Sequence, residues 1–186
     1  IPALQSFYKQ DTVIYIGTFS KAISPALRVG YMILPKVLMK QYKKICGTFP
    51  CPVSKTTQAI LADFIHKGYF EKHLNRMRKI YKGKHDFLLT QIQKYLPAPL
   101  FSVSGDNAGL YVLLHYQGSR SDDEILENAQ KNNIRLCSLN DYYPDPDVVC
   151  SHTYLIGFAD LSPEEITKGI LLLAEKVFLS PGSYPG

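Results

Sequence analysis

The sequence predicts an α/β fold in which short strands are covered by longer helices. Runs of β-branched and aromatic residues at 13–16 and 109–115 are typical of strands. Between such runs lie segments with apolar residues at helical spacing, of which 69–95 is the longest. Elements that alternate in this way favour helices packed on a sheet. The length of 186 residues allows one domain or parts of two, and a hydrophobic content of 46% suffices for a core.

The chain begins with two predicted strands that flank a turn. The first covers 13–16 and is expected to end at Gly17, and the second covers 29–34. Pro35 then precedes a short predicted helix over 37–46, whose apolar residues form one stripe.

Two further helices complete the first half of the chain. Ser54 can cap the first of them. Five residues of that helix are expected to be mostly buried: Ala59, Ile60, Ala62, Phe64 and Ile65. A break at Gly68 leads into the long helix over 69–95, which Pro97 and Pro99 stop.

The order of strands and helices in the second half of the sequence predicts a small α/β domain with a partly antiparallel sheet. Ser121 is expected to cap a helix with acidic residues in its first turn. Ser162 and Pro163 are expected to open the final helix in the same manner. The predicted strands of this half are 101–103, 109–115, 134–138 and 153–158.

Composition excludes several functional classes. No apolar run reaches the roughly 18 residues that a membrane span requires. The first ten residues have no signal-peptide pattern and suggest an entry into the middle of a longer, cytoplasmic protein. The four cysteines have no metal-ligand spacing, which favours free thiols. The net charge of +5 is spread along predicted helices without a nucleic-acid-binding motif, so we expect solvated helix faces.

The turn between the first two strands carries the chemistry. Thr18 and Ser20 are followed by Lys21, and Arg28 comes just before the second strand. Hydroxyls and a guanidinium can hold a phosphate by charge-assisted hydrogen bonds. Schiff-base chemistry requires a neutral lysine amine, which nearby cations favour. The alternative is a lysine in an ordinary strand–turn–strand segment.

This segment, GTFSKAISPALRVGY, resembles the pyridoxal-phosphate lysine motif of fold type I aminotransferases. It is most similar to the aminotransferase-like domain of MocR-type regulators, which belong to the GntR family. The resemblance continues through 69–81, 108–114 and 155–175. It implies pyridoxal 5'-phosphate as cofactor and Lys21 as the Schiff-base lysine. It also implies that the phosphate ligands are Thr18, Ser20 and Arg28.

The resemblance also implies an organisation like that of aspartate aminotransferase. Residues 1–97 would be the C-terminal part of the large cofactor-binding domain, 98–180 the small α/β domain, and 181–186 a tail. The full-length protein is expected to form a homodimer that binds an amine or amino acid. Any DNA contact is expected only through a domain outside this chain.

Two features depart from the family pattern. Leu155 stands where many aminotransferases have an arginine that clamps the substrate carboxylate. Upstream of Lys21 the only acidic residue is Asp11, which is too close in sequence to reach the cofactor ring nitrogen. We therefore expect the chain to be the C-terminal part of a larger protein and inactive in isolation.

Three functions remain open at this stage. The first is a pyridoxal-phosphate-dependent aminotransferase-like domain that transaminates an amino compound. The second is a sensing domain of a GntR/MocR-type regulator that binds its effector without turnover, which the loss of the carboxylate arginine at Leu155 favours. The third is an α/β interaction domain without cofactor.

Overall fold

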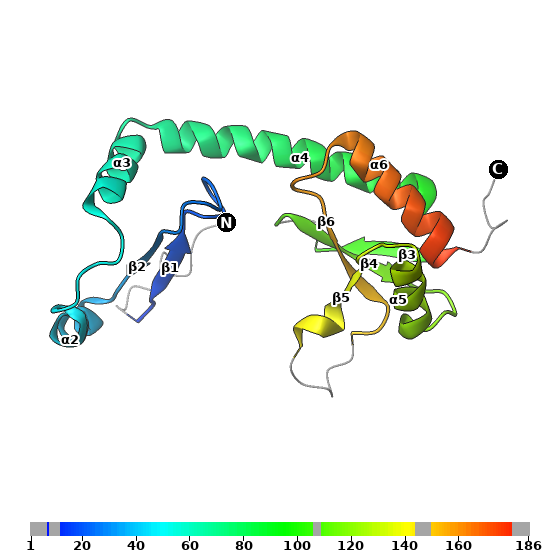
Figure 1. Ribbon diagram of the computed structural model, residues 1–186, viewed down its shortest axis with the longest axis horizontal. Coiled ribbons are helices and arrows are strands. Elements are labelled where there is room, and N and C mark those ends of the chain that lie inside the picture. The colour runs from blue at the N-terminus through cyan, green and yellow to red at the C-terminus, as the bar shows by residue number, and fades with distance from the viewer. Residues whose placement is uncertain (1–6, 8–11, 106–108, 144–149, 180–186) are drawn as a thin grey trace. The chain divides into compact units, whose positions relative to one another are not determined.

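The computed structural model describes residues 7, 12–105, 109–143 and 150–179 (Figure 1). Asp11 and the tail at 181–186 lie outside the described residues. The chain divides into two compact units, residues 1–77 and 78–186. The predicted domain boundary at 97/98 remains a prediction.

The first unit contains the predicted hairpin. β1 (Tyr15–Thr18) pairs antiparallel with β2 (Gly30–Ile33), and Gly17 lies opposite Tyr31. The expectation that Gly17 ends the first strand is therefore wrong. The reason is visible locally, because a Cβ on residue 17 would lie 2.4 Å from the Tyr31 ring. Glycine is used here for the close approach of that ring and not to stop the strand.

Two helices follow the hairpin, α2 (Lys36–Cys46) and α3 (Lys55–His66). The predicted cap of α3 is confirmed, since the Ser54 side chain accepts a hydrogen bond from the Thr57 backbone N–H at 3.1 Å. Such a cap satisfies one of the unpaired N–H groups of the first turn.

The predicted burial of α3 is wrong. Leu61 is its buried residue, whereas Ile60 is 65% exposed and Ile65 is 44% exposed. Ala59 and Ala62 are exposed as well, and Phe64 is half-buried. The apolar side chains were expected to face a core, but the described residues cover this face of α3 only in part, at Leu61 and Phe64.

The long helix α4 (Tyr69–Tyr95) has the predicted bounds. Gly68 precedes it with a φ of 72°, a left-handed backbone conformation that glycine adopts without strain. The division between the two units falls inside this helix, after Met77. Its buried residues, Leu88, Gln91 and Ile92, all belong to the second unit.

The second unit is built on a four-stranded sheet with the order β3-β4-β6-β5. All pairs between its described strands are antiparallel, which corrects the expectation of a partly antiparallel sheet. The edge strand β5 is also shorter than the predicted 134–138. The strands are β3 (Phe101–Ser104), β4 (Tyr111–Tyr116), β5 (Cys137–Ser138) and β6 (Thr153–Gly157).

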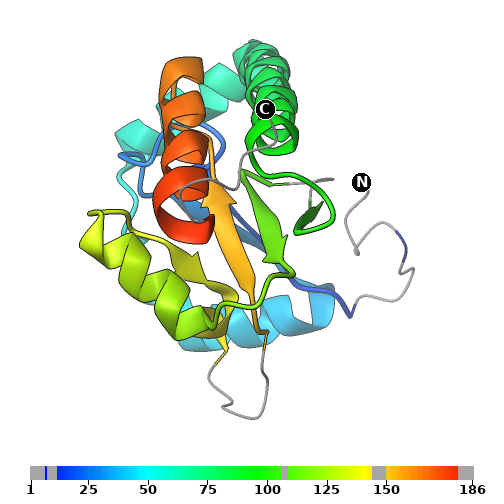
Figure 2. The ribbon, with the colours of Figure 1, turned by 90° about the vertical axis from the view of Figure 1, so that its right-hand side faces the viewer.

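Three helical segments cover one face of this sheet (Figure 2). They are the second half of α4, α5 (Asp122–Lys131) and α6 (Pro163–Leu172), which continues into a π-helical turn at Leu173–Phe178. Both predicted caps are confirmed, because Ser121 and Ser162 each form a capping box. Successive side chains of a strand point to opposite faces of the sheet, so every second residue faces the core. The buried apolar residues of the strands are Phe101, Val112, Leu114, Tyr116, Tyr154 and Ile156.

The half-buried carboxylate of Asp122 fixes the entry into β6. The two oxygens of Asp122 accept hydrogen bonds from the His152 backbone N–H at 3.1 and 3.0 Å, and Asp122 also accepts one from the Tyr154 hydroxyl. His152 has a φ of 55°, which is uncommon for a residue other than glycine. The Asp122 contacts therefore hold a strained turn in place at the start of the strand.

No helix among the described residues is both long and apolar enough to span a membrane.

Candidate functional site

The turn that contains Lys21 extends the hairpin of β1 and β2. The Phe19 N–H donates to the Val29 carbonyl at 2.9 Å, so strand-like pairing continues beyond Thr18. The Ile23 N–H then donates to the Phe19 carbonyl at 2.8 Å and closes the chain around Lys21. Lys21 lies in this closed turn and is exposed.

The structure brings the predicted phosphate ligands together. The Ser20 backbone N–H donates to the Thr18 hydroxyl oxygen at 3.0 Å. The Ser20 hydroxyl donates to the Leu27 carbonyl at 2.8 Å, and Arg28 Nη1 donates to the Ser20 Oγ at 3.4 Å. Thr18 and Arg28 are both exposed and Ser20 is half-buried. The turn thus presents two hydroxyls, a guanidinium and the Lys21 amine at one end of the hairpin.

An aromatic cluster supports this turn from the strand side. The Phe19 ring lies 5.2 Å from the Tyr31 ring and 5.9 Å from the Phe70 ring. Tyr15 and Tyr31 are stacked with their centroids 6.0 Å apart. A hydrogen bond with Tyr15 is the main reason why the pKa of Tyr31 is raised, and burial adds to it. Tyr31 is 39% exposed, so this cluster lies at the surface of the described residues.

Leu155 and Arg135 belong to the second unit. Leu155 lies in the middle of β6, opposite Leu113 on β4 and Cys137 on β5. Arg135 is exposed and precedes β5.

The sequence analysis missed a polar ladder across the sheet. His115 Nδ1 lies 3.1 Å from the Thr153 hydroxyl, and His115 Nε2 lies 2.6 Å from the Ser104 hydroxyl. The Thr153 hydroxyl donates to the Ser151 carbonyl at 3.2 Å, so it is available to accept from Nδ1–H. Nε2 then accepts from Ser104. The three side chains lie on three adjacent strands, and this arrangement is visible only once the strands are paired.

Comparison with known proteins decides the family. The family model described as aminotransferase class I and II matches residues 3–186.

The chain belongs to the class I and II aminotransferase family.

Within this aminotransferase family, regulators are prominent among the curated relatives. An uncharacterised HTH-type transcriptional regulator of Bacillus subtilis, YdeL, is 36% identical over 171 residues, which cover 91% of this chain and 36% of that protein. The probable rhizopine catabolism regulatory protein MocR of Rhizobium meliloti is 29% identical. That match covers 91% of this chain and 34% of MocR. The chain therefore spans about a third of the length of these relatives.

Solved aminotransferases show the same fold. The kynurenine aminotransferase of Pyrococcus horikoshii is 24% identical with a TM-score of 0.79, covering 93% of this chain and 42% of that structure. The α-aminoadipate aminotransferase LysN of Thermus thermophilus, solved with N-(5'-phosphopyridoxyl)-L-leucine, is 23% identical with a TM-score of 0.70. That match covers 91% of this chain and 42% of LysN. These likenesses identify the fold as aspartate aminotransferase-like, fold type I.

Proposed function

We propose that this chain is the part of a pyridoxal-phosphate-dependent aminotransferase-like domain that attaches the cofactor through Lys21. The observation that carries the proposal is the closed turn in which Lys21 lies beside the hydrogen-bonded group of Thr18, Ser20 and Arg28. Membership of the family implies pyridoxal 5'-phosphate as the cofactor.

The residues of the turn fit that cofactor. Its phosphate needs hydrogen-bond donors and positive charge, and the turn offers the Thr18 hydroxyl proton and the Arg28 guanidinium. Ser20 is already bonded to the Leu27 carbonyl and to Arg28, so it orients the guanidinium as well as contributing a hydroxyl. When bound, pyridoxal phosphate supplies an aldehyde that reacts with an amine and a ring that accepts electrons from the substrate.

Lys21 has the two properties that this role requires. Lys21 is exposed on the same turn as the proposed phosphate ligands, so a cofactor held by Thr18, Ser20 and Arg28 would be within reach of its amine. Once freed by an incoming substrate amine, the Lys21 amine would be able to carry a proton to and from the substrate, because it lies on the same turn as the residues that would hold the cofactor. The ring of Phe19, next to this turn, packs on Tyr31 and Phe70 and so supports its position.

The decisive experiment is borohydride reduction of the full-length protein after incubation with pyridoxal 5'-phosphate. Reduction fixes a lysine-bound cofactor permanently, and peptide mapping by mass spectrometry then locates it. We expect the added mass on the peptide that contains Lys21. A label spread over many lysines, or confined to another one, would refute the proposal.

Arg28→Ala is expected to weaken the binding of pyridoxal 5'-phosphate by about 10- to 100-fold, because it removes a charge-assisted pair of hydrogen bonds. Arg28→Lys should lose less, since it keeps the charge without the fork. Equilibrium titration of the visible absorbance measures both. An Arg28→Ala affinity equal to that of the wild type would show that the phosphate binds elsewhere.

A second function is favoured by the regulator relatives and by Leu155. In that case the domain binds cofactor and amine as an effector site of a GntR/MocR-type transcription regulator, with no turnover. DNA would then be bound through another domain, and a homodimer is expected in both cases. The two functions separate in one assay. An amine that shifts the absorbance without yielding keto acid from a supplied acceptor favours sensing, whereas keto acid formation favours an aminotransferase.

A further inference from the structure

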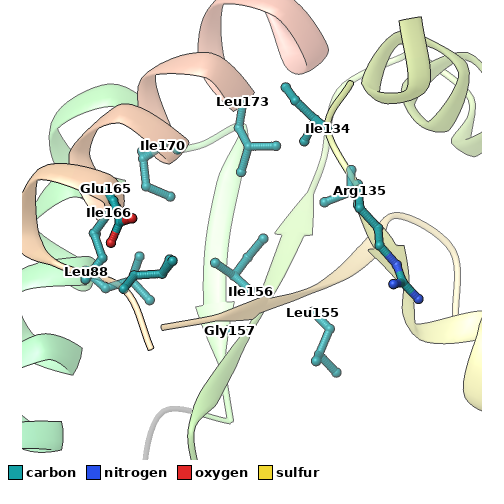
Figure 3. A pocket seen from close by; sticks show the side chains of 13 residues that line it. Leu88, Ile134, Arg135, Leu155, Ile156, Gly157, Glu165, Ile166, Ile170 and Leu173 are labelled. Carbon is teal, nitrogen blue, oxygen red and sulfur yellow. The ribbon is translucent and has the colours of Figure 1, made fainter. Parts of the chain in front are cut away.

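The sheet of the second unit carries a polar group on the face opposite its helices. Successive residues of β6 point to opposite sides of the sheet, and Figure 3 shows Ile156 directed toward α6 and Leu155 directed away from it. Thr153 lies two residues before Leu155 and therefore faces away from the helices. His115 on β4 is the cross-strand partner of Thr153, and the Ser104 hydroxyl of β3 contacts the same imidazole ring. The three side chains thus share one face of three adjacent strands.

The hydrogen bonds of this group run in one direction. The Thr153 hydroxyl donates its proton to the Ser151 carbonyl at 3.2 Å, so it acts as an acceptor toward His115. His115 Nδ1 lies 3.1 Å from the Thr153 hydroxyl oxygen and therefore carries the ring proton. His115 Nε2 is then the acceptor for the Ser104 hydroxyl, whose oxygen lies 2.6 Å away. The Thr153 contact thus leaves Nε2 free to take a proton from Ser104.

This order of groups is that of an activated nucleophile. In such sites a hydroxyl is hydrogen-bonded to a histidine that can take its proton, and a third group holds the other ring nitrogen. Ser104, His115 and Thr153 occupy these three positions. Because threonine is neutral, it fixes the orientation of the ring without stabilising a positive charge on it. We therefore expect Ser104 to react more slowly than the serine of a triad that contains a carboxylate.

The surroundings of Ser104 indicate which reagent suits it. Ser104 is half-buried at the end of β3, and the next residue, Gly105, is exposed and has no side chain to shield the hydroxyl. The cross-strand partner of Ser104 is Leu113, which is half-buried on the same face of the sheet. Leu113 offers dispersion contacts to an aliphatic group placed beside the hydroxyl. These neighbours favour a small aliphatic acyl group.

We propose that Ser104 is a nucleophile that accepts an acyl group from a small aliphatic ester or thioester. The Ser104 oxygen forms the bond to the acyl carbon while its proton passes to His115 Nε2. The bond between that carbon and the leaving group then breaks, and His115 returns the proton to the leaving group. This acylation site shares no residue with the turn of Lys21 and goes beyond the proposed function.

A fluorophosphonate probe tests the nucleophile directly in the full-length protein. An activated serine displaces fluoride from its phosphorus atom and stays covalently attached, so peptide mapping by mass spectrometry locates the label. We expect the label on the peptide that contains Ser104, formed at least about 100-fold faster than on a serine without a general base. Pretreatment with p-nitrophenyl butyrate should reduce the labelling, because this ester acylates the same oxygen. Absence of the label, or a label confined to other residues, would overturn the proposal.

Two serine variants locate the reaction. Ser104→Ala is expected to abolish the labelling. Ser102→Ala is its matched control, because Ser102 belongs to the same strand and face, is exposed and lies directly opposite His115. The control should keep the wild-type rate, and an equal loss in both variants would contradict the assignment to Ser104. The labelling needs no pyridoxal 5'-phosphate, so its outcome is independent of the borohydride experiment on Lys21.

Two further variants test the roles of the other members of the group. His115→Gln removes the base and is expected to slow the labelling at least about 100-fold. Thr153→Val keeps the base but removes the acceptor of the Nδ1 proton, so a smaller loss is expected. Labelling of His115→Gln at the wild-type rate would show that the histidine does not activate Ser104, and the proposal would fall.

Discussion

Lys21→Ala in the full-length protein is expected to abolish the covalent fixation of pyridoxal 5'-phosphate by borohydride. The reason is chemical, because alanine has no side-chain amine and the closed turn places Lys21 beside the proposed phosphate ligands Ser20 and Arg28. The fold should be unaffected, since Lys21 is an exposed residue of a turn. The intact mass after reduction measures the effect directly.

Lys36→Ala is the matched control for this variant. Lys36 is also an exposed lysine of the first unit, at the start of α2, and it has no part in the turn. The control variant should retain the fixed cofactor in wild-type amount. Should Lys21→Ala retain it instead, another lysine would be the attachment site and the proposed function would have to be abandoned in this form.

Asp122→Ala is expected to lower the free energy of unfolding by about 3 kcal/mol. The substitution leaves two donors without their acceptor, the hydroxyl of the buried Tyr154 and the backbone N–H of the half-buried His152. Each unsatisfied buried donor costs about 1–3 kcal/mol. Urea unfolding followed by circular dichroism provides the measurement.

Asp123→Ala separates this effect from that of the helix dipole. Asp122 and Asp123 both lie in the first turn of α5, where acidic side chains are favourable, but Asp123 is exposed. The control variant is therefore expected to lose only about 0.5 kcal/mol. If both variants lost the same amount, the buried contacts of Asp122 would have no role of their own.

Tyr154 adds a pH dependence to the same cluster. Burial, followed by the hydrogen bond to Asp122, raises the pKa of Tyr154 well above its ordinary value of 10.0. Above about pH 10 the folded state therefore keeps the Tyr154 phenol protonated, whereas the phenol ionises in the unfolded state. This contribution to stability is complete below about pH 10 and declines as the pH rises above it. Unfolding of Tyr154→Phe should depend less steeply on pH in that range.

Local signals in the sequence were sufficient for most helix bounds. The caps at Ser54, Ser121 and Ser162 and the break at Gly68 depend on residues within a few positions of each other. Burial was predicted less well, because it depends on what covers a surface. Helix α3 shows this, since helical spacing alone could not indicate that Ile60 and Ile65 are exposed among the described residues while Leu61 is buried.

The same distinction applies to the candidate site. Thr18, Ser20, Lys21 and Arg28 lie in one turn between two paired strands, so a short motif could predict that they meet. The partners of His115 lie 11 and 38 residues away, and His152 is held by residues of another segment. Sequence spacing could not indicate these contacts, because strand pairing brings the partners to the histidines.

The continuous helix α4 has a mechanical consequence. A helix of 27 residues is about 40 Å long, and the division between the two units falls within it. Any bending between the units must therefore deform a hydrogen-bonded rod instead of turning a loose connection. Gly83 is the glycine in this rod and has open space around it, which makes it the position where such deformation costs least.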